Sequence, residues 1–340
     1  MRIAFFSAKS FERKVFDEHR SSEHEIDYFE ARLTAASAPL GRGYPVVCAF
    51  VSDQVDRAVI DDLAAHGLKL LALRSAGFNH VDLEACARHQ ITVVRVPAYS
   101  PHAVSEHTLC LLLALNRKIH RAYQRVRELN FSLDGLVGFD IHDKTIGIIG
   151  TGKIGRLFAT AVTGLGARVL ACDPSPSEEV RALRGARYGT LDELMASSDI
   201  ISLHCPLTPA TNHLINAGRI AQMKSGVIIL NTGRGQLIDT AALIQGLKTG
   251  KIGGAGLDVY EEEEGIFFSD LSQEILHDDT LARLLTFPSV LITAHQGFLT
   301  REALRNIAET TLRTISEFAR GHVRGEVIVG EEGHVSHSRH

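Results

Sequence analysis

Short apolar runs alternate with polar stretches along the first hundred residues of the chain. Residues 3–6, 46–51, 70–73 and 91–94 are rich in Ile, Val, Leu and Phe, and polar helical or irregular segments separate them. Such runs are typical of strands that are buried on both faces of a parallel sheet. The pattern therefore predicts parallel β/α units, with one helix at residues 52–66.

The same alternation resumes at residue 145. Between the two series, residues 102–128 contain no Pro or Gly and predict one long helix. Its stretch 109–115 is apolar almost all round, which favours burial in a core or against a partner subunit. Pro97 and Pro101 indicate a crossing between two domains just before this helix. Further strands are predicted at 145–149, 168–172, 200–203, 227–230, 254–259 and 290–293, and helices at 156–165, 191–196, 216–223, 240–248 and 302–319.

The strand predicted at 145–149 runs directly into glycines spaced as G-x-G-x-x-G, namely Gly150, Gly152 and Gly155. In a dinucleotide-binding turn the first glycine makes the tight turn and the second lets the backbone approach a pyrophosphate. The third lets the next helix lie close to the sheet. The N–H groups at the start of that helix form an anion site. A plain glycine turn is the alternative, and the strand before and the helix after favour the dinucleotide.

An acidic residue, Asp173, stands at the end of the next predicted strand. Its carboxylate can accept hydrogen bonds from the hydroxyls of an adenosine ribose and would repel a 2′-phosphate, and no Arg follows it closely. The sequence therefore predicts NAD rather than NADP as the cofactor.

Size and charge narrow the classes of function. A chain of 340 residues exceeds the usual size of a single core, so two domains are expected. A net charge of −4 gives no reason to expect a nucleic-acid or membrane partner. The absence of a signal-peptide pattern and of a long apolar run predicts a cytoplasmic protein. The histidines show no metal-ligand spacing, and the five cysteines, without C-x-x-C, are expected to be buried, reduced thiols.

Polar residues follow three predicted strands in the second half of the chain. Arg234 stands between two glycines, Glu263 follows the strand at 254–259, and His295 follows the last strand. Arg is well shaped to hold a carboxylate by two parallel hydrogen bonds, and a histidine held by a carboxylate suits proton transfer. The three suit reduction of a 2-oxo acid: Arg234 binds the carboxylate, His295 donates the proton and Glu263 orients His295. Taken singly, each is also compatible with a purely structural role.

A loop of small residues, Ser75, Ala76 and Gly77, follows the strand predicted at 70–73. Open α/β sheets bind ligands at such strand ends, so its backbone N–H groups are candidates for binding an anion or a carbonyl. A simple strand-to-helix turn is the alternative.

As a set, these motifs resemble the D-2-hydroxyacid dehydrogenases, from Val46 to about Ile315. Ala294 departs from the Pro that much of the family has before the histidine, and Glu263 counts against the formate dehydrogenases, which have Gln there. Residues 73–82 and 261–270 look like the fermentative D-lactate dehydrogenase branch. The resemblance is carried by residues 150–155 with Asp173, 204–208, 211–213, 231–235, 256–261 and 293–295.

The resemblance implies two doubly wound parallel-sheet domains: a Rossmann NAD domain at 101–296 inserted into a flavodoxin-like substrate domain formed by 1–100 and 297–340. It also implies that NADH reduces pyruvate to D-lactate, that Arg234, Glu263 and His295 are catalytic, and that the NAD domain builds a homodimer or homotetramer. The expected cofactor contacts are Gly150, Thr151, Gly152, Lys153, Ile154, Gly155, Asp173, His204, Cys205, Pro206, Asn212, Thr232, Gly233 and Asp258. The expected substrate contacts are Ser75, Ala76, Gly77, Tyr99, Arg234, His295 and Phe298.

Several alternatives stay open at this point. Another 2-oxo acid, such as hydroxypyruvate, glyoxylate or a branched-chain acid, is compatible with the same residues, because each methylene of a substrate changes binding by only about 1–3 kcal/mol. An NAD-sensing binding protein of the same fold is a further alternative. His204 is also compatible with a structural hydrogen bond, and Tyr99 with packing between domains. The tail at 330–340 is expected to be disordered.

Overall fold

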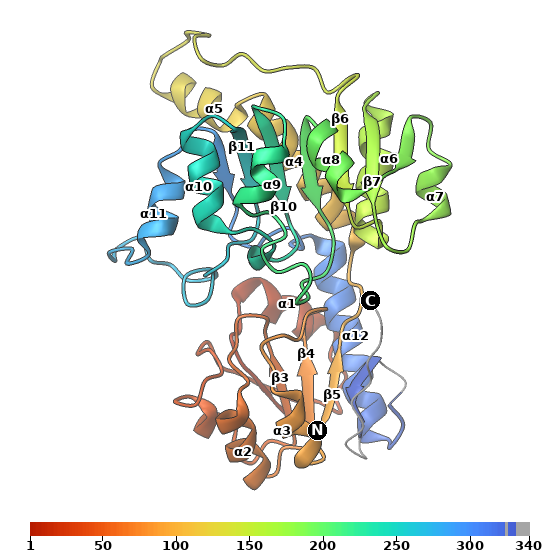
Figure 1. Cartoon of the computed structure of the whole chain (residues 1–340). Helices are drawn as coiled ribbons and strands as arrows, with labels where there is room; N and C mark the ends of the chain where they lie inside the picture. Colours follow the sequence, from red (N-terminus) through yellow and green to blue (C-terminus); the bar gives the residue numbers. More distant parts are fainter. Residues whose placement is uncertain (324–325, 331–340) are drawn as a thin grey trace. The chain divides into compact units, whose positions relative to one another are not determined.

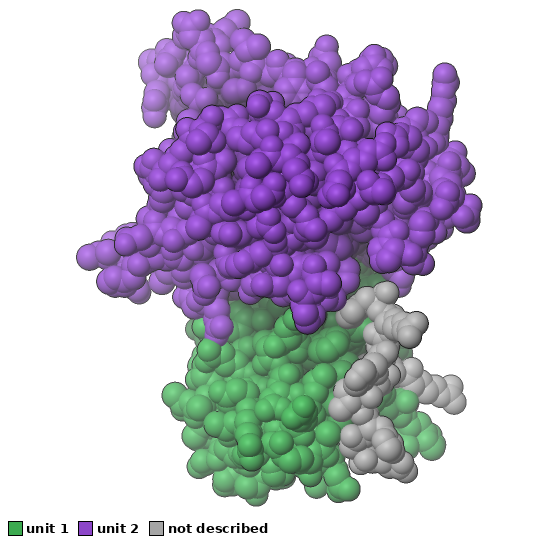
Figure 2. Space-filling view, in the orientation of Figure 1, with its two compact units in different colours: residues 1–100, 298–340 green, residues 101–297 purple. Residues whose placement is uncertain are grey.

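The computed structural model describes residues 1–323 and 326–330 of the chain (Figure 1). They divide into two compact units (Figure 2). Unit 1 contains residues 1–100 and the described residues from 298 onward, and unit 2 contains residues 101–297. Apart from Gly330, the predicted disordered tail lies outside the described residues.

Unit 1 is built on a six-stranded sheet with the order β13-β5-β4-β3-β1-β2. Its strands are parallel except β13, which pairs antiparallel with β5. β3 and β4 are buried at every residue, which accounts for their continuous apolar runs. The strands are β1 Arg2–Phe5, β2 Glu25–Tyr28, β3 Val46–Ala49, β4 Leu70–Leu73, β5 Thr92–Arg95 and β13 Glu326–Val329, and the helices are α1 Ser10–His19, η1 Ala38–Gly41, α2 Arg57–Ala65, α3 Leu83–Arg88 and α12 Arg301–Ala319.

Each face of the unit 1 sheet has its own apolar core, because successive residues of a strand point to opposite faces. Val47 and Ala49 of β3 lie in a core with residues of α2 and α3. Val46 and Cys48 lie in the other core, with Phe16 of α1 and residues of α12. Helices therefore cover both faces, as the predicted doubly wound architecture requires.

Unit 2 is built on a seven-stranded parallel sheet with the order β12-β11-β10-β9-β6-β7-β8. The chain adds β7 and β8 on one side of β6 and then crosses to add β9 and its successors on the other side. Ligands bind at such a reversal, beyond the carboxyl ends of the strands. The strands are β6 Thr145–Ile149, β7 Arg168–Cys172, β8 Ala186–Tyr188, β9 Ile200–Leu203, β10 Val227–Asn231, β11 Ile252–Leu257 and β12 Val290–Ile292. The helices are α4 Pro101–Asn116, α5 Ile119–Arg127, α6 Lys153–Gly164, α7 Glu178–Arg181, α8 Leu191–Ser197, α9 Ala217–Gln222, η2 Gly235–Leu237, α10 Thr240–Lys248 and α11 Asp279–Leu285.

Glycines in β11 let α4 lie close to the sheet of unit 2. A Cβ built on Gly256 would lie 2.9 Å from Leu230 Cδ2 and 3.3 Å from Leu111 Cβ of α4. A Cβ on Gly254 would lie 3.2 Å from Leu115 Cδ2. Leu111 and Leu115 are buried in the core of this face, so the helix packs directly on the strand.

Two helix predictions are wrong in extent. The single helix predicted at 102–128 is two helices, because Lys118 adopts a left-handed conformation, with φ 52°, between α4 and α5. The helix predicted at 52–66 begins at Arg57, where the side chain of Asp56 caps it by accepting from Val59 N–H. Hydrophobic spacing carries no signal of a single left-handed residue, which is why periodicity predicted one helix.

The prediction of buried thiols is correct for only two of the five cysteines. Cys48 and Cys86 are buried, Cys172 and Cys205 are partly buried, and Cys110 is exposed. Cys110 stands within an apolar run, but it lies on the outer face of α4, so the run alone was misleading.

Candidate active site

The glycine loop after β6 has the shape that a dinucleotide pyrophosphate needs. Gly150 has φ 93°, and a Cβ on it would lie 2.6 Å from Cys205 N. A Cβ on Gly155 would lie 2.0 Å from the Gly150 carbonyl oxygen, so only glycine fits at either position. Gly152 is the N-cap of α6, and a Cβ there would meet no described atom within 4 Å. That open approach to the N-terminus of a helix fits a phosphate group.

Asp173, directly after β7, holds the same loop. One carboxylate oxygen accepts from Thr151 N–H at 2.5 Å and from the Thr151 hydroxyl at 3.0 Å, and the other accepts from Ser175 N–H at 2.7 Å. The Tyr188 hydroxyl of β8 donates to Thr151 Oγ1 at 2.9 Å. Because a carboxylate has about four acceptor sites, Asp173 keeps capacity for a ribose hydroxyl. The loop and its acid thus fit the adenosine end of NAD.

His204 and Cys205 follow β9 and lie against the glycine turn. His204 Nε2 is 2.8 Å from Ser202 Oγ, and its ring centroid lies 5.3 Å from that of Phe158. Burial lowers the pKa of His204 to about 4, so the imidazole is neutral at neutral pH. Burial also raises the pKa of the Cys205 thiol to about 11. Both side chains are therefore uncharged beside the turn.

The loop after β10 contains two more of the predicted cofactor residues. Thr232 Oγ1 lies 2.9 Å from Thr108 Oγ1 of α4, and Gly233 N–H donates to Asn231 Oδ1 at 3.0 Å. α4 therefore fixes this strand end. The other predicted cofactor residues are Lys153 and Ile154 in the first turn of α6, and the exposed Pro206 and Asn212 after β9.

His295 and Glu263 form a hydrogen-bonded pair. His295 Nδ1 lies 2.8 Å from Glu263 Oε1, and both side chains are mostly buried, with 15% and 27% of their surfaces exposed. Tyr260 N–H donates to Glu263 Oε2 at 3.1 Å, and the Phe268 ring lies 5.6 Å from the imidazole. The structure thus brings together two residues that stand far apart in the sequence.

Arg234 lies on the loop that packs against the segment before Glu263. A Cβ on Gly235 would lie 2.0 Å from the Tyr260 carbonyl oxygen, so the two loops are in direct contact. The Arg234 guanidinium donates to the Gly233 carbonyl oxygen at 2.7 Å, and no carboxylate among the described residues forms an ion pair with it. Its remaining donors are free to bind an anion.

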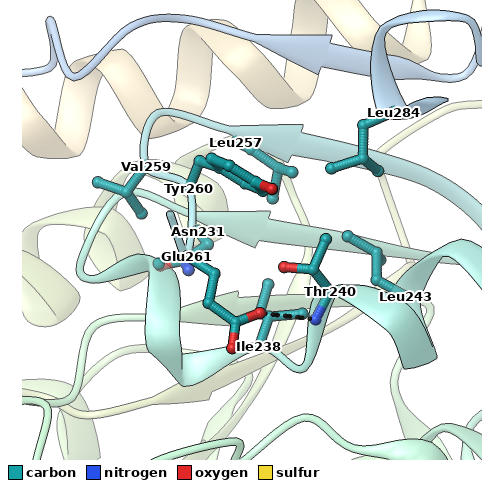
Figure 3. Close-up of a pocket in the computed structure, with 10 residues that line it drawn as sticks. Asn231, Ile238, Thr240, Leu243, Leu257, Val259, Tyr260, Glu261 and Leu284 are labelled. Carbon is teal, nitrogen blue, oxygen red and sulfur yellow. Dashed lines mark hydrogen bonds between the residues drawn. The ribbon is translucent and has the colours of Figure 1, made fainter. Parts of the chain in front are cut away.

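A small pocket adjoins this loop contact (Figure 3). Its walls include Asn231, Gly235, Tyr260 and Glu261, and the Glu261 carboxylate accepts from Thr240 N–H at 3.1 Å. The interior, about 10 Å³, has room for about one water molecule. It is too small for NAD or a 2-oxo acid.

Asp258, at the end of β11, organises the turn that carries His295. Its carboxylate accepts from the Thr293 hydroxyl at 2.7 Å and from the N–H groups of Gln296 and Gly297 at 2.8 Å each. Burial would raise the pKa of Asp258, but hydrogen bonds from His107, Thr293 and Gly297 outweigh it and hold the pKa below its usual value. Asp258 is therefore a buried, charged anchor.

The predicted substrate residues of unit 1 lie at two places. Ser75 Oγ donates to the Gly77 carbonyl oxygen at 2.7 Å, and Arg95 donates to the Ala76 carbonyl oxygen at 2.8 Å. Their loop is thus fixed from both sides. Tyr99 and Phe298 are brought together with their ring centroids 6.0 Å apart.

Sequence reasoning missed a buried ion pair directly before this loop. The Arg74 side chain is fully buried, and its Nε donates to Glu12 Oε1 at 2.9 Å. Arg74 also donates to the carbonyl oxygens of Phe6 and Cys48, so it ties the ends of β1, β3 and β4 together. The sequence did contain an indication of this ion pair, because Arg74 is a charged residue directly after the apolar run of β4.

Two classes of feature are absent from the described residues. No group of three or more His, Cys, Asp or Glu side chains within 1–323 and 326–330 is arranged to hold a metal ion. In the same part of the chain, every helix is too short or too polar to cross a membrane.

Comparison with known proteins shows which family the chain resembles. Residues 109–297 match the family described as "D-isomer specific 2-hydroxyacid dehydrogenase, NAD binding domain". The chain is 51% identical to "2-hydroxyacid dehydrogenase homolog 1" of Schizosaccharomyces pombe, over 97% of this chain and 99% of that protein. It is 48% identical to D-lactate dehydrogenase of Escherichia coli, over 94% and 98% of the two chains.

A solved structure with bound cofactor is also similar. It is D-lactate dehydrogenase from Aquifex aeolicus complexed with NAD and lactic acid, at a TM-score of 0.86 and 33% identity. The match covers 96% of this chain and 99% of that one. These likenesses confirm the predicted fold class and the predicted NAD cofactor.

Proposed function

The chain belongs to the D-isomer-specific 2-hydroxyacid dehydrogenases, which bind NAD, and from this premise we propose that it reduces pyruvate to D-lactate with NADH. The D-lactate dehydrogenases among its relatives support the substrate. The 2.8 Å pairing of His295 with Glu263 carries the chemical part of the proposal, since the reduction needs a positioned proton donor.

Glu263 selects the tautomer of His295. Because its carboxylate accepts from Nδ1–H, the opposite ring nitrogen, Nε2, is left to exchange a proton with the substrate. In pyruvate reduction, the protonated imidazole gives its Nε2 proton to the carbonyl oxygen on C2, and Glu263 stabilises the charged ring before the transfer. In the reverse direction, neutral Nε2 takes the proton from the hydroxyl group.

Arg234 holds the substrate carboxylate in this proposal. Its guanidinium has no carboxylate partner among the described residues and can make two parallel hydrogen bonds to one. This contact orients C2 and draws electron density from the ketone. NADH, when bound, supplies the hydride that adds to C2. Ser75, Ala76, Gly77, Tyr99 and Phe298 are proposed as further substrate contacts.

The test is NADH oxidation by the purified protein, followed by absorbance. Pyruvate, hydroxypyruvate, glyoxylate and 2-oxoisocaproate are compared by kcat/KM, and the pyruvate product is analysed for chirality. Highest kcat/KM on pyruvate, with D-lactate formed, supports the proposal. A preference for another 2-oxo acid moves the enzyme to a different substrate, and no turnover on any of them leaves an NAD-binding protein without this activity.

We also propose that unit 2 builds a homodimer or homotetramer. The segment from α5 to residue 139 exposes a group of large apolar side chains, and none of the residues in α5 is buried. An exposed apolar surface of this kind marks a protein interface, and a second copy of the chain is the proposed occupant. The exposed side chains are Ile119, Tyr123, Val126, Leu129, Phe131, Leu133, Val137 and Phe139.

A further inference from the structure

His107 of α4 contacts the anchor of the catalytic turn. Its Nε2 lies 2.9 Å from Thr293 Oγ1 and 3.3 Å from Asp258 Oδ1. The imidazole is mostly buried, with 17% of its side-chain surface exposed, and Asp258 is almost completely buried. Sequence analysis did not single out His107, because its partners lie far away in the chain.

The directions of these hydrogen bonds follow from the hydroxyl of Thr293. A hydroxyl has one proton, and that of Thr293 goes to Asp258 Oδ1 at 2.7 Å. Thr293 Oγ1 must therefore accept from His107, so His107 carries its proton on Nε2. The result is a relay from the imidazole through the hydroxyl to the carboxylate, in which each bond strengthens the next.

The turn that this relay holds has an unfavourable backbone conformation. His295 has φ 55°, in the left-handed region, which costs about 1–2 kcal/mol for a residue with a side chain. Its N–H donates to the Asp258 carbonyl oxygen at 2.7 Å and to the Thr293 carbonyl oxygen at 2.8 Å. The same two residues that hold the backbone of His295 thus receive the hydrogen bonds of His107.

Gly297 shows how closely the turn fits around this group. A Cβ built on Gly297 would lie 2.8 Å from Asp258 Oδ2 and 3.4 Å from His107 Cδ2. The neighbouring residue of α4, Thr108, bonds Thr232 after β10. One turn of α4 therefore fixes the ends of two strands around the site.

We propose that His107 is a positioning residue for His295: through Thr293 and Asp258 it holds the 293–297 turn in the conformation that aims the His295 imidazole. This inference rests on the proposed function, in which His295 transfers the proton. His107 does not touch the substrate or the reacting atoms in this role.

The test compares two variants of the full-length protein. His107→Leu removes the N–H donor, and His107→Gln keeps an N–H group at a similar reach. We expect His107→Leu to lower kcat on the preferred 2-oxo acid by about tenfold to a hundredfold, because a catalytic group is misplaced. NADH binding, measured by fluorescence, is expected to change by less than about twofold, and His107→Gln is expected to recover most of kcat. His102→Leu, an exposed histidine of the same helix, is the matched control and is expected to behave as wild type.

A second readout is independent of turnover. In protein labelled with ¹⁵N-histidine, the imidazole signals of His295, assigned with His295→Asn, should shift in His107→Leu and return in His107→Gln. Unchanged kcat and unchanged His295 signals in His107→Leu overturn the proposal. If the wild type reduces no 2-oxo acid, the proposed function fails, and the imidazole signals alone then decide the positioning role.

A second pair of variants covers the case in which His107→Leu does not fold. Thr293→Val removes the hydroxyl that accepts from His107, and Thr293→Ser keeps it. A kcat that falls in Thr293→Val and is retained in Thr293→Ser supports the relay. Equal kcat values in the two variants overturn it.

Discussion

His295 is held at two points by different residues. Glu263 fixes the ring through Nδ1, and Asp258 fixes the backbone through its carbonyl oxygen. A free histidine side chain would sample several rotamers, and restricting them lowers the entropy that must be lost in the transition state. The proton-transfer role that we propose for His295 therefore depends on both contacts.

Replacing Glu263 by Gln tests the first contact. Gln keeps the shape but has no charge to stabilise the imidazolium, and its amide oxygen is a weaker acceptor for Nδ1–H. We expect kcat to fall by about a hundredfold or more and NADH binding to stay nearly unchanged. Stopped-flow measurement of a single turnover separates chemistry from product release. A Glu263→Gln enzyme with wild-type kcat would remove Glu263 from the mechanism.

The second prediction at the residue scale concerns His204 and the pH dependence of the protein's stability. Burial lowers its pKa from 6.5 to about 4 in the folded protein. Between these two values the unfolded chain binds a proton that the folded chain does not, so stability falls as the pH drops through this window. We expect a contribution of about 2 kcal/mol to the loss between neutral pH and about pH 5.

Urea unfolding at the two pH values measures this loss. His204→Gln keeps a hydrogen-bond partner for Ser202 but does not titrate. Between neutral pH and about pH 5, the free energy of unfolding of this variant should therefore fall by about 2 kcal/mol less than that of the wild type. Equal losses in the two proteins would show that His204 does not control the pH dependence.

At the scale of elements, periodicity predicted the buried strands better than the exposed ones. β4, β7 and β9 have the predicted bounds because most of their residues are apolar and buried. β2, β8 and β13 were missed. All three are short edge strands, and β2 and β8 have half-exposed side chains. The pattern of a half-buried edge is not distinct from that of a loop.

In the candidate site as well, the sequence predicted some residues and gave no indication of others. Arg234, Glu263 and His295 carry a signal because each is a polar residue in the loop that follows a strand of the unit 2 sheet. The contact of His107 with Thr293 carries none, because it joins a helix to a turn 186 residues away. The packing of α4 on the sheet of unit 2 brings these two residues together.

At the scale of elements, we make one prediction, which concerns the exposed face of α5. Ile119, Tyr123 and Val126 are 58%, 63% and 51% exposed and lie on one face of the helix at helical spacing. If a second copy covers this face, two lysines placed in it bury unpaired charges and separate the copies. We expect Ile119→Lys with Val126→Lys to yield monomer by light scattering. Gln124→Lys, on another face of α5, should keep the wild-type mass. A monomeric wild type, or a double variant of unchanged mass, would contradict the interface.

At the scale of the whole molecule, the chain consists of two units, and only one of them contains the predicted cofactor contacts. Every predicted NAD contact, from Gly150 to Asp258, belongs to unit 2. Unit 1 holds its own buried ion pair, between Arg74 and Glu12, and two apolar cores of its own. Each unit therefore has its own sources of stability, and we expect NADH to stabilise unit 2, where all of its predicted contacts lie.

Calorimetry with NADH tests this division. At a concentration of about a hundred times its Kd, NADH should stabilise unit 2 by about 2.7 kcal/mol. The Tm of unit 2 should therefore rise. Arg74→Leu leaves the Glu12 carboxylate buried without its partner and should lower the transition of unit 1, which identifies that transition when two are resolved. Asp173→Ala releases Thr151 and removes the predicted acceptor for the ribose, so it should reduce the increase in Tm caused by NADH. If the two units unfold in one step, NADH should raise the single Tm and Arg74→Leu should lower it. Asp173→Ala should make the increase caused by NADH smaller. A Tm that NADH leaves unmoved, or an Asp173→Ala shift as large as that of the wild type, would contradict the assignment of the cofactor site to the β6–β7 end of unit 2.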